Sequence, residues 1–561
     1  MTDYRKIAAL LFPQIHKTPE DYAAQYPARS LPEGAAVTRF APSPTGFIHI
    51  GAVYAAMIAQ RLARQSGGVF YLRIEDTDKK REVEDGIAQI VRGLEAFGIV
   101  ADEGFVPGGE TGAYGPYQQS HRGDIYQCYA KDLVERGLAY PCFCTEEDLN
   151  SVREKQEAQK LRTGYYGAFA HCRELSDEEI ENKVRAKTPF VLRLKSPGRE
   201  DRRISFADKI KGKIEMPEND QDLVLLKRDG IPTYHFAHAV DDHLMGTTLV
   251  VRGDEWISST PIHMQLFQAL GFKPPKYAHI APIMKEENGS KRKLSKRKDP
   301  EAAVLYYYAE GYPAASVLEY LDTISNSNFE DWRRANPAAD RWEFPFQLSK
   351  MSQSGALFDL NKLNDVSKNC ISRMTAREVY EGIASWAREY DPAFAALLEK
   401  DPDYAKAILS IDRGGSKPRK DLAKWADAKA YMAYFYQELY QPDYTLPEQV
   451  APADAAAVLA AYEKVYDPED DKEAWFAKVK ALCEPLGFSP DVKAYKKDPS
   501  GFKGHVGDLS TVIRIAVTSR RNTPDLCAIM GLLGRDACFQ RLRAAKEYYQ
   551  SAGASARAGV K

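Results

Sequence analysis

A pattern near the start of the chain restricts its possible folds most: a strand, a turn rich in proline and glycine, a helix and a second strand. The segments VTRFA (37–41) and VFYLRIE (69–75) are rich in the β-branched and aromatic residues typical of strands. Between them, AVYAAMIAQRLARQ (52–65) has the alanine content and apolar spacing of a helix. Because such a unit places its two strands in parallel, the pattern predicts a doubly wound α/β sheet.

The rest of the chain extends this prediction. With 561 residues it is long enough for roughly three or four domains. From about residue 310 the pattern changes to helices joined by short turns. Before that point, strands are expected at 190–195, 222–227 and 248–253, and helices at 84–98 and 262–271.

The composition excludes several classes of protein. The net charge is −2, and 44% hydrophobic residues are typical of a folded chain rather than a disordered one. No run of 18 apolar residues occurs, the first residues lack the cleavage site of a secretory signal, and eight cysteines are too few for a disulfide framework. We therefore expect a cytoplasmic protein that does not associate with membranes.

The segment RFAPSPTGFIHIGA (39–52) joins the first strand to the helix and has the properties of an anion-binding turn. Two prolines and Gly46 stiffen the loop, and Gly51 lies at the start of the helix, where backbone N–H groups favour a phosphate. His49 stands where an imidazole can donate a hydrogen bond to a phosphate oxygen. Taken alone, the spacing does not distinguish this role from an ordinary turn with a hydrogen-bonded histidine.

A second segment, KRKLSKRK (291–298), carries six Lys or Arg residues among eight. Lys293 and Lys296 flank a serine, and two mobile ammonium groups in a loop suit the clamping of a triphosphate. Because like charges repel, we expect this loop to be mobile without an anion. The alternative is a solvated loop or a patch that binds nucleic acid without specificity.

In this order, RFAPSPTG-x₂-HIGA, LRIEDTD (72–78) and KLSKR (293–297) resemble the motifs of class I aminoacyl-tRNA synthetases, specifically the bacterial-type glutamyl-tRNA synthetases. HIGA occupies the place of the HIGH motif, with Ala52 instead of the second histidine, and KLSKR the place of the KMSKS motif. The likeness covers most of the chain, continuing through 115–145, 229–261, 355–364 and 510–534.

The resemblance implies a multidomain protein: an α/β Rossmann-type catalytic domain with an insertion that binds the acceptor end of tRNA, then an all-α anticodon-binding region. The segment 411–423 is either a crossing between domains or a loop that caps a helix bundle. The expected parts are an N-terminal helical extension at 1–35, the catalytic domain at 36–310 with its insertion at about 140–220, a helical stem-contact region at 311–412 and a helical anticodon-binding region at 413–561.

It also implies the residues of an amino-acid pocket. Arg39 and Arg252 match positions that bind the γ-carboxylate of glutamate, for which a planar guanidinium is a strong and directional partner. Glu75 matches the acceptor for the α-amino group. The likeness does not extend to His238, which stands where relatives often carry Asn. The other matches are the loop residues Ala41 and Ser43 and the aromatic walls Tyr234 and Trp256.

The reaction that the resemblance implies is the ligation of L-glutamate to tRNA(Glu). The glutamate α-carboxylate attacks the α-phosphate of ATP, bound with Mg²⁺, and the 2′-hydroxyl of the terminal adenosine then takes the acyl group from glutamyl-adenylate. His49, Lys293 and Lys296 are the expected catalytic residues and, with Gly51, the expected ATP-binding residues. Catalysis then consists of positioning and electrostatic stabilisation of the phosphate. We expect the enzyme to be a monomer.

Three cysteines indicate a metal site in the insertion. Cys142 and Cys144 form a Cys-x-Cys pair, and Cys172 follows in YYGAFAHCRE (165–174). Some synthetases of this family hold zinc in this region, and zinc requires four tetrahedral ligands. Reduced cysteines without a metal are the alternative. Candidates for the fourth ligand are Tyr166, His171 and Glu174.

The C-terminal segment 501–561 is basic, with ten Lys or Arg residues and four Asp or Glu residues in a chain of net charge −2. Arg520 and Arg521 lie in VTSRRNTP, which reads as a turn before a helix, and we expect them to bind tRNA. The helix-rich context favours bases that stack on arginine and aromatic side chains. The alternative is a solvated pair that contacts nothing.

Other functions share part of this pattern. Glutaminyl-tRNA synthetases typically read PEPNG and FDDTNP where this chain has PSPTG (42–46) and IEDTD (74–78). A shortened tRNA-modifying glutamyl transferase lacks the anticodon half, and a non-enzymatic RNA-binding protein needs no adenylate pocket. The sequence favours glutamate and leaves open whether tRNA(Gln) is charged as well.

Overall fold

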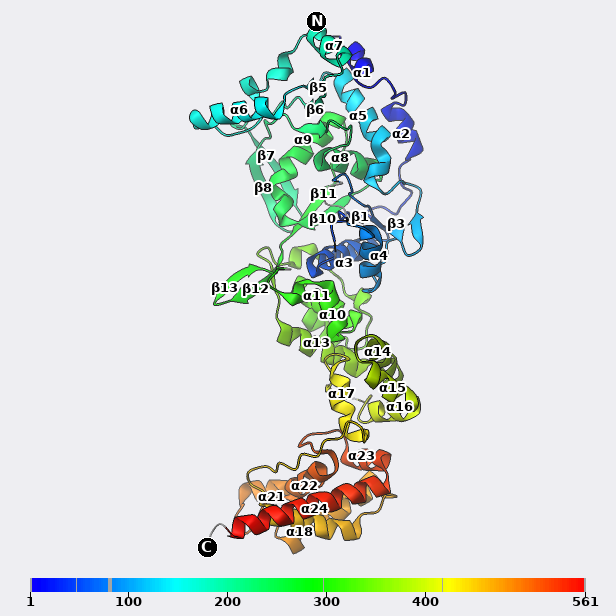
Figure 1. The fold of residues 1–561 in the computed structure, drawn as a ribbon, viewed down its shortest axis with the longest axis vertical. Helices are drawn as coiled ribbons and strands as arrows, with labels where there is room; N and C mark the ends of the chain where they lie inside the picture. Colours follow the sequence, from blue (N-terminus) through cyan, green and yellow to red (C-terminus); the bar gives the residue numbers. More distant parts are fainter. Residues whose placement is uncertain (1–2, 47, 79–82, 296, 416, 559–561) are drawn as a thin grey trace. The chain divides into compact units, whose positions relative to one another are not determined.

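The computed structural model divides the chain into two compact units (Figure 1). The first comprises Met1–Tyr306 and Leu318–Asp359, and the second Tyr307–Val317 and Leu360–Lys561. Two of the three points of division fall within α10 (Val304–Glu310) and α11 (Ala314–Ser325), and the third lies directly before α13 (Leu360–Arg373). The structure describes every residue except 1–2, 47, 79–82, 296, 416 and 559–561.

The first unit mixes helices and strands. Its helices are α1 (Tyr4–Leu11), α2 (Pro19–Gln25), α3 (Ile50–Gln65), α4 (Gly86–Glu95), α5 (Gly123–Glu135), α6 (Glu146–Ala158), α7 (Asp177–Arg185), α8 (Tyr234–Leu244), α9 (Thr260–Leu270) and α12 (Phe329–Ala335). Its strands are β1 (Val37–Phe40), β2 (Val69–Leu72), β3 (Glu103–Val106), β4 (Gly109–Thr111), β5 (Ala139–Cys142), β6 (Val191–Leu194), β7 (Arg203–Asp208), β8 (Gly212–Pro217), β9 (Val224–Leu226), β10 (Leu249–Gly253), β11 (Lys276–Ile280), β12 (Ile283–Glu287), β13 (Ser290–Lys293) and β14 (Ala356–Leu357).

The parallel sheet expected from the sequence is confirmed. One sheet has the order β1-β2-β3-β4, in which the first three strands are parallel and β4 pairs antiparallel with β3. A second has the order β10-β11-β7-β8, in which β10, β11 and β7 are parallel. The backbone N–H of Thr248 donates to the carbonyl of Val37 at 3.0 Å, so the two sheets adjoin where β1 and β10 begin. The first unit is therefore an α/β domain of the Rossmann type.

Two of the expected strands belong to a separate, smaller sheet. β6 and β9 pair antiparallel with each other, and β5 pairs antiparallel with β6. The run FVLRLK is apolar enough for a buried strand of either direction, so its composition carried no information on its partner. Only β10 of the three strands expected after residue 190 joins the parallel sheet.

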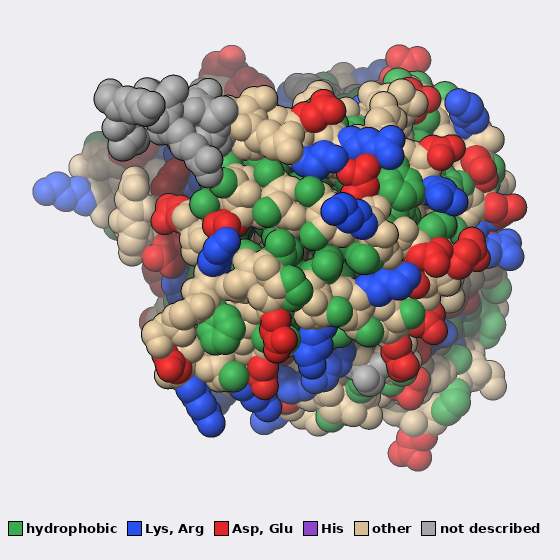
Figure 2. All heavy atoms as spheres, turned by 90° about the horizontal axis from the view of Figure 1, so that it is seen from below, with side chains coloured by type: hydrophobic (Ala, Val, Ile, Leu, Met, Phe, Trp, Pro, Cys, Tyr) green, Lys and Arg blue, Asp and Glu red, His purple; other side chains and the backbone are tan. Residues whose placement is uncertain are grey.

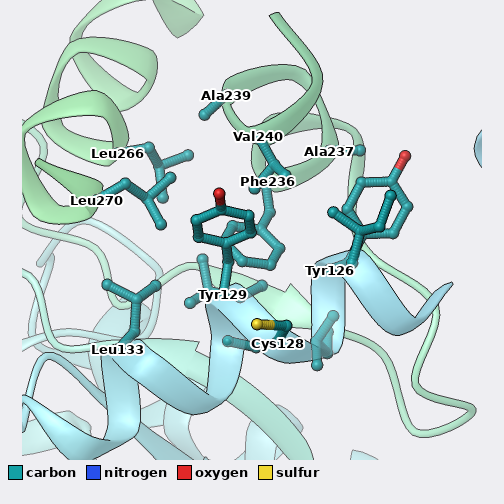
Figure 3. Packing of buried hydrophobic residues seen from close by; sticks show 14 of the residues in the cluster. Tyr126, Cys128, Tyr129, Leu133, Phe236, Ala237, Ala239, Val240, Leu266 and Leu270 are labelled. Carbon is teal, nitrogen blue, oxygen red and sulfur yellow. The ribbon is translucent and has the colours of Figure 1, made fainter. Parts of the chain in front are cut away.

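A buried apolar layer holds α8 in place. Figure 3 shows Tyr129 and Leu133 of α5 facing Phe236 and Val240 of α8, with Leu266 of α9 beside them, and all five are fully buried or nearly so. Burial of each large apolar side chain contributes roughly 1.5–3 kcal/mol. α8 also carries Tyr234, three histidines and two aspartates, so this apolar face fixes the helix that brings polar side chains to the site described below.

The second unit is helical, as expected: no strand occurs among its described residues. Two apolar clusters form its interior, and α23 takes part in both, with Ile529 in one and Leu526 and Met530 in the other. No helix in the described part of the chain is long and apolar enough to span a membrane. The helices are α13 (Leu360–Arg373), α14 (Ala376–Tyr390), α15 (Pro392–Lys400), α16 (Pro402–Ser410), α17 (Asp427–Met432), α18 (Pro452–Val465), α19 (Lys472–Ala481), α20 (Cys483–Leu486), α21 (Val492–Lys497), α22 (Val506–Thr518), α23 (Leu526–Leu533) and α24 (Arg535–Ala558).

Candidate active site

A cavity of about 940 Å³ opens in the first unit at the carboxyl ends of β1 and β10 and at the N-terminus of α3. The edge formed by the carboxyl ends of parallel strands is the usual ligand site of an open α/β sheet. The residues that the motifs single out come together here, while Lys296 lies outside the described residues. The cavity is lined by Arg39, Ala41, Ser43, His49, Gly51, Glu75, Tyr234, Arg252, Trp256 and Lys293, among others.

His49 caps the N-terminus of α3. Its Nδ1 accepts a hydrogen bond from the backbone N–H of Ala52 at 3.2 Å. An accepting Nδ1 carries no hydrogen, so the neutral ring carries its hydrogen on Nε2 and is a donor there. A Cβ atom on Gly51 would lie 2.8 Å from the imidazole, so glycine is required for this ring position. The hydrogen bond that caps α3 therefore also places the ring hydrogen on Nε2, where it can serve as the donor that the sequence predicted.

Arg39 and Glu75 are held by a buried ion network. The Nε of Arg39 lies 3.3 Å from a carboxylate oxygen of Asp242, and Arg73 donates to Asp242 at 2.7 Å and to Glu75 at 3.0 Å. Burial raises the pKa of Glu75, while the charges of Arg73 and Arg39 oppose that shift. Burial also disfavours ionised Asp242, but Arg39 and Arg73 outweigh it and hold its pKa well below the ordinary value. Sequence reasoning missed Arg73 and Asp242; for Arg73, a charged residue in the apolar run VFYLRIE (69–75) was the available signal.

Arg252, only 6% exposed, is surrounded by neutral hydrogen-bond acceptors. Its Nε donates to His279 at 2.9 Å, its Nη1 to His263 at 3.0 Å, and its Nη2 to the Thr260 hydroxyl at 3.0 Å and the Trp256 carbonyl at 3.3 Å. Burial holds the pKa of both histidines below the ordinary value, so they stay neutral. No ion pair joins Arg252 to a carboxylate among the described residues. A buried cation with neutral neighbours favours an anionic ligand.

Aromatic rings form a wall beside this cation. The rings of Tyr234 and Trp256 lie 4.4 Å apart, centroid to centroid, and both line the cavity. Tyr234 begins α8 and Trp256 follows β10. His238 is fully buried, with its ring centroid 5.8 Å from that of Tyr234, and its Nε2 lies 3.1 Å from the hydroxyl of Tyr277. His238 is not among the residues that line the cavity.

The basic segment differs from the prediction in its first half. The prediction of a loop is wrong for Ser290–Lys293, which form β13 and pair antiparallel with β12. Arg292 pairs with Asp299 and Glu287 at 2.6 Å each, so acidic residues on both sides compensate part of the charge that was expected to repel. Lys293 ends the strand and lines the cavity. The expected mobility around Lys296 stays a prediction, since that residue lies outside the described part of the chain.

The cysteines Cys142, Cys144 and Cys172 come together, as the sequence predicted. Their sulfur atoms all lie within 4.8 Å of one another, and no further Cys, His, Asp or Glu among the described residues joins the group. Hydrogen bonds from Cys144 and Cys172 lower the pKa of Cys142. Tyr166, one expected fourth ligand, instead donates its hydroxyl to the Arg162 carbonyl at 2.6 Å.

The side chain beside the sulfurs is that of Tyr165, whose hydroxyl lies 3.2 Å from the sulfur of Cys144. His171 and Glu174, the other expected fourth ligands, are not part of the cluster. Neighbouring residues of an extended segment point to opposite sides, so the sequence did not distinguish Tyr165 from Tyr166.

Arg520 and Arg521 lie in the turn between α22 and α23, and both are exposed. The turn follows Ser519, which adopts a left-handed conformation (φ 60°) at the end of α22. Arg521 donates to the Leu446 carbonyl at 2.7 Å, and Arg520 lines a cavity of about 670 Å³ together with Tyr440. On the face of the molecule in Figure 2, basic and acidic side chains are interspersed rather than separated into one basic patch.

Comparisons with known proteins identify the family of the chain. The family described as "tRNA synthetases class I (E and Q), catalytic domain" matches residues 35–365, and the "Anticodon binding domain" family matches residues 500–546. The chain is 51% identical over 544 residues to the "Glutamate--tRNA ligase" of Clostridium perfringens (strain 13 / Type A), covering 96% of this chain and 100% of that protein. It is 50% identical over 542 residues to that of Acetivibrio thermocellus, covering 96% and 99%.

A solved structure of a glutamate tRNA ligase is also similar to this chain. A glutamate tRNA ligase from Elizabethkingia meningosepticum in complex with its amino acid is similar with a TM-score of 0.70 and 27% identity, covering 91% of this chain and 99% of that one. From the family match over 35–365 and these near full-length relatives, the chain belongs to the class I tRNA synthetases for glutamate and glutamine, within the glutamate--tRNA ligase family.

Proposed function

We propose that this enzyme ligates L-glutamate to the 2′-hydroxyl of the terminal adenosine of tRNA(Glu) through a glutamyl-adenylate, at the expense of ATP. The observation that carries the proposal is Arg252, a buried cation that faces the cavity and has only neutral acceptors around it. A dicarboxylic amino acid brings the missing negative charge, whereas an uncharged side chain leaves the cation unpaired.

The remaining pocket residues fit glutamate in one orientation. Arg39 and Arg252 receive the γ-carboxylate, and Glu75 accepts from the α-ammonium group. The Arg73 guanidinium, 3.0 Å from Glu75, supports the ionised carboxylate that this contact needs. The rings of Tyr234 and Trp256 and the loop residues Ala41 and Ser43 enclose the aliphatic part.

ATP binds at the start of α3 in this proposal. The helix N-terminus and the Nε2 hydrogen of His49 face phosphate oxygens, and Gly51 keeps the imidazole in position. Lys293 and, by the motif, Lys296 stabilise the charge that develops on the phosphates, and Mg²⁺ enters with ATP as part of the substrate. The α-carboxylate of glutamate attacks the α-phosphorus and pyrophosphate leaves; no side-chain nucleophile is required.

The second substrate, tRNA(Glu), takes the acyl group. We place its acceptor end on the insertion at about 140–220 and its anticodon on the region 413–561, with 311–412 along the stem. The preceding residues 1–35 form the helical extension. The match of 500–546 to an anticodon-binding family supports the second placement.

Aminoacylation tests the proposal. Purified enzyme, ATP, Mg²⁺ and radiolabelled glutamate should give acid-precipitable label on tRNA(Glu). A tRNA that ends in 2′-deoxyadenosine should accept none, whereas one that ends in 3′-deoxyadenosine should accept label. Label on the 2′-deoxy tRNA contradicts the proposed site of transfer. Parallel reactions with tRNA(Gln) establish whether this enzyme also charges that tRNA; the glutaminyl-tRNA synthetase alternative requires labelled glutamine to be the better substrate.

We also propose that the cysteine cluster holds one zinc ion, with Cys142, Cys144 and Cys172 as ligands. Three sulfurs within 4.8 Å of one another fit a tetrahedral site, and the hydroxyl of Tyr165, 3.2 Å from the sulfur of Cys144, offers an oxygen for the fourth position. Zinc here would stabilise the insertion rather than take part in chemistry.

A double substitution tests this site. Atomic absorption should find about one zinc per chain, and Cys142→Ser with Cys144→Ser should release it. We expect slower transfer to tRNA with unchanged adenylate formation, because the cluster is separate from the cavity. Cys128→Ser, at a buried cysteine outside the cluster, is the matched control. Metal-free wild-type enzyme with full transfer activity would show that these cysteines serve only as reduced core residues.

The turn at Arg520 and Arg521 gives a further prediction. Charge reversal by Arg520→Glu with Arg521→Glu should weaken tRNA binding and flatten its dependence on salt, because each lost phosphate contact removes about one counterion from the slope. Titration of cognate and non-cognate tRNA at two salt concentrations measures both effects. If affinity falls for the cognate tRNA alone and its dependence on salt is unchanged, the turn contacts a base. Wild-type binding of both tRNAs by the double variant removes this turn from the interface.

A further inference from the structure

Arg252 is positioned by two residues that do not line the cavity, His279 and Asp208. β10 and β11 pair in parallel with Arg252 opposite His279, and β7 pairs with β11 at Asp208. The three side chains thus come from three adjacent strands and are at least 94% buried. The Nε of Arg252 donates to Nε2 of His279 at 2.9 Å, and Nδ1 of His279 lies 2.7 Å from Oδ2 of Asp208.

The protonation of His279 follows from its two neighbours. Asp208 accepts backbone hydrogen bonds from Ile210 at 2.9 Å and Lys211 at 2.8 Å on Oδ1, and from His279 at 3.0 Å on Oδ2. All its partners are donors, so the carboxylate is ionised and accepts the Nδ1 hydrogen of His279. The neutral ring then has a lone pair on Nε2. That lone pair meets Arg252, which can only donate.

The hydrogen bonds of Arg252 leave little of its guanidinium uncommitted. A guanidinium has five N–H groups, and four hydrogen bonds run to His279, His263, Thr260 and the Trp256 carbonyl. The guanidinium carbon also lies 4.7 Å from the ring centroid of Tyr277. These contacts fix the orientation of the guanidinium before any ligand binds. One N–H on Nη1 remains to donate a hydrogen bond to the ligand.

We propose that Asp208 and His279 are positioning residues for amino-acid recognition: a carboxylate-histidine relay that aims Arg252 while leaving its positive charge uncancelled. A carboxylate in direct contact with Arg252 would orient it equally well, but it would compete with the γ-carboxylate of the substrate. A neutral imidazole orients Arg252 without that competition. Asp208 contacts the imidazole rather than Arg252, and it fixes the tautomer of the imidazole. The inference rests on the proposed function, in which Arg252 binds the γ-carboxylate.

Two substitutions at His279 separate the parts of the relay. Glutamine places an amide oxygen near the position of Nε2 and retains an acceptor for Arg252. Asparagine places its amide near Nδ1 and retains only the contact with Asp208. We expect His279→Asn to raise KM for glutamate roughly 10- to 100-fold, as for one lost hydrogen bond to a charged group. His279→Gln should stay within about threefold of wild type.

The readouts distinguish positioning from general loss of structure. In tRNA charging, His279→Asn should raise KM for glutamate with KM for ATP and kcat little changed, because the relay acts on ground-state binding. The ratio of kcat/KM for glutamate over glutamine should fall in the same variant and recover in His279→Gln. Should either variant melt below the assay temperature, Asp208→Asn supplies the same comparison, since its amide faces donors only.

Three outcomes decide the matter. A selective rise in KM for glutamate, rescued by glutamine, supports the relay. Equal kinetics of His279→Asn, Asp208→Asn and wild type overturn it, as does a uniform loss in kcat and both KM values with no rescue by glutamine. Failure of the wild-type enzyme to charge tRNA with glutamate overturns instead the proposed function on which the relay rests.

Discussion

Replacing Arg252 with glutamine is expected to lower kcat/KM for glutamate by roughly two to three orders of magnitude. The substitution leaves the γ-carboxylate desolvated without its main partner, which costs roughly 2–5 kcal/mol. It should not produce an efficient glutamine enzyme, because Arg39 remains beside the pocket and the surrounding acceptors, His279, His263 and Thr260, lose their donor. Steady-state charging of tRNA with each amino acid measures both effects.

Arg252→Lys is the matched control for this prediction. Lysine keeps the charge but not the planar fork, so it can serve only some of the four acceptors and should give intermediate activity. Melting temperatures of both variants separate a lost contact from a lost fold. Unchanged kcat/KM for glutamate in Arg252→Gln would falsify the assignment of the pocket.

The second large effect is expected at His49. Asparagine is a good N-cap residue and can accept from the Ala52 N–H, so His49→Asn keeps the helix start and removes the Nε2 donor. Loss of one preorganised donor to a reacting phosphate typically costs about 10²- to 10³-fold in rate. We expect a loss of this size in kcat for adenylate formation, with KM for glutamate little changed.

His49→Ala serves as the comparison, because it removes the donor and the cap together. It should show the same loss in kcat and, in addition, a stability about 0.5–2 kcal/mol lower. Urea unfolding of the three proteins measures that difference. If His49→Asn retains wild-type kcat, the histidine is only a helix cap, and the segment is an ordinary turn with a hydrogen-bonded histidine.

Much of the site was predictable because motif residues lie near one another in the chain or follow strands of one sheet. Arg39 lies near the carboxyl end of β1 and His49 precedes α3, so a strand, turn, helix unit already brings them to one edge. Arg252 lies at the carboxyl end of β10 for the same reason. The family resemblance indicated the role of each residue. The parallel sheet explains why these residues lie close together.

The residues that sequence reasoning missed act through pairings across the sheet or between elements far apart in the chain. Asp242 sits on α8 and holds Arg39 of β1, a pairing that depends on how the apolar face of α8 packs against α5. Asp208 and His279 meet only because β7 and β11 are neighbours, an order that strand composition does not encode.

The basic segment was misjudged for a related reason. A run of charges is usually a solvated loop, and this pattern predicted one, but it takes account only of the charges within the segment itself. Asp299 and Glu287 pair with Arg292, and the backbone of 290–293 completes a hairpin with β12. Likewise Tyr165, not Tyr166, faces the cysteine cluster because local backbone direction decides which neighbour points inward.

The most direct test of the central claim is the exchange of labelled pyrophosphate into ATP. Adenylate formation is reversible, so an enzyme that makes glutamyl-adenylate incorporates labelled pyrophosphate into ATP only when its own amino acid is present. We expect incorporation with glutamate and tRNA(Glu), little with glutamine, and a large reduction in His49→Asn and Arg252→Gln. Each reaction is run with and without tRNA. Exchange that is supported by glutamine as well as by glutamate, or none with glutamate and tRNA(Glu) together, would contradict the account.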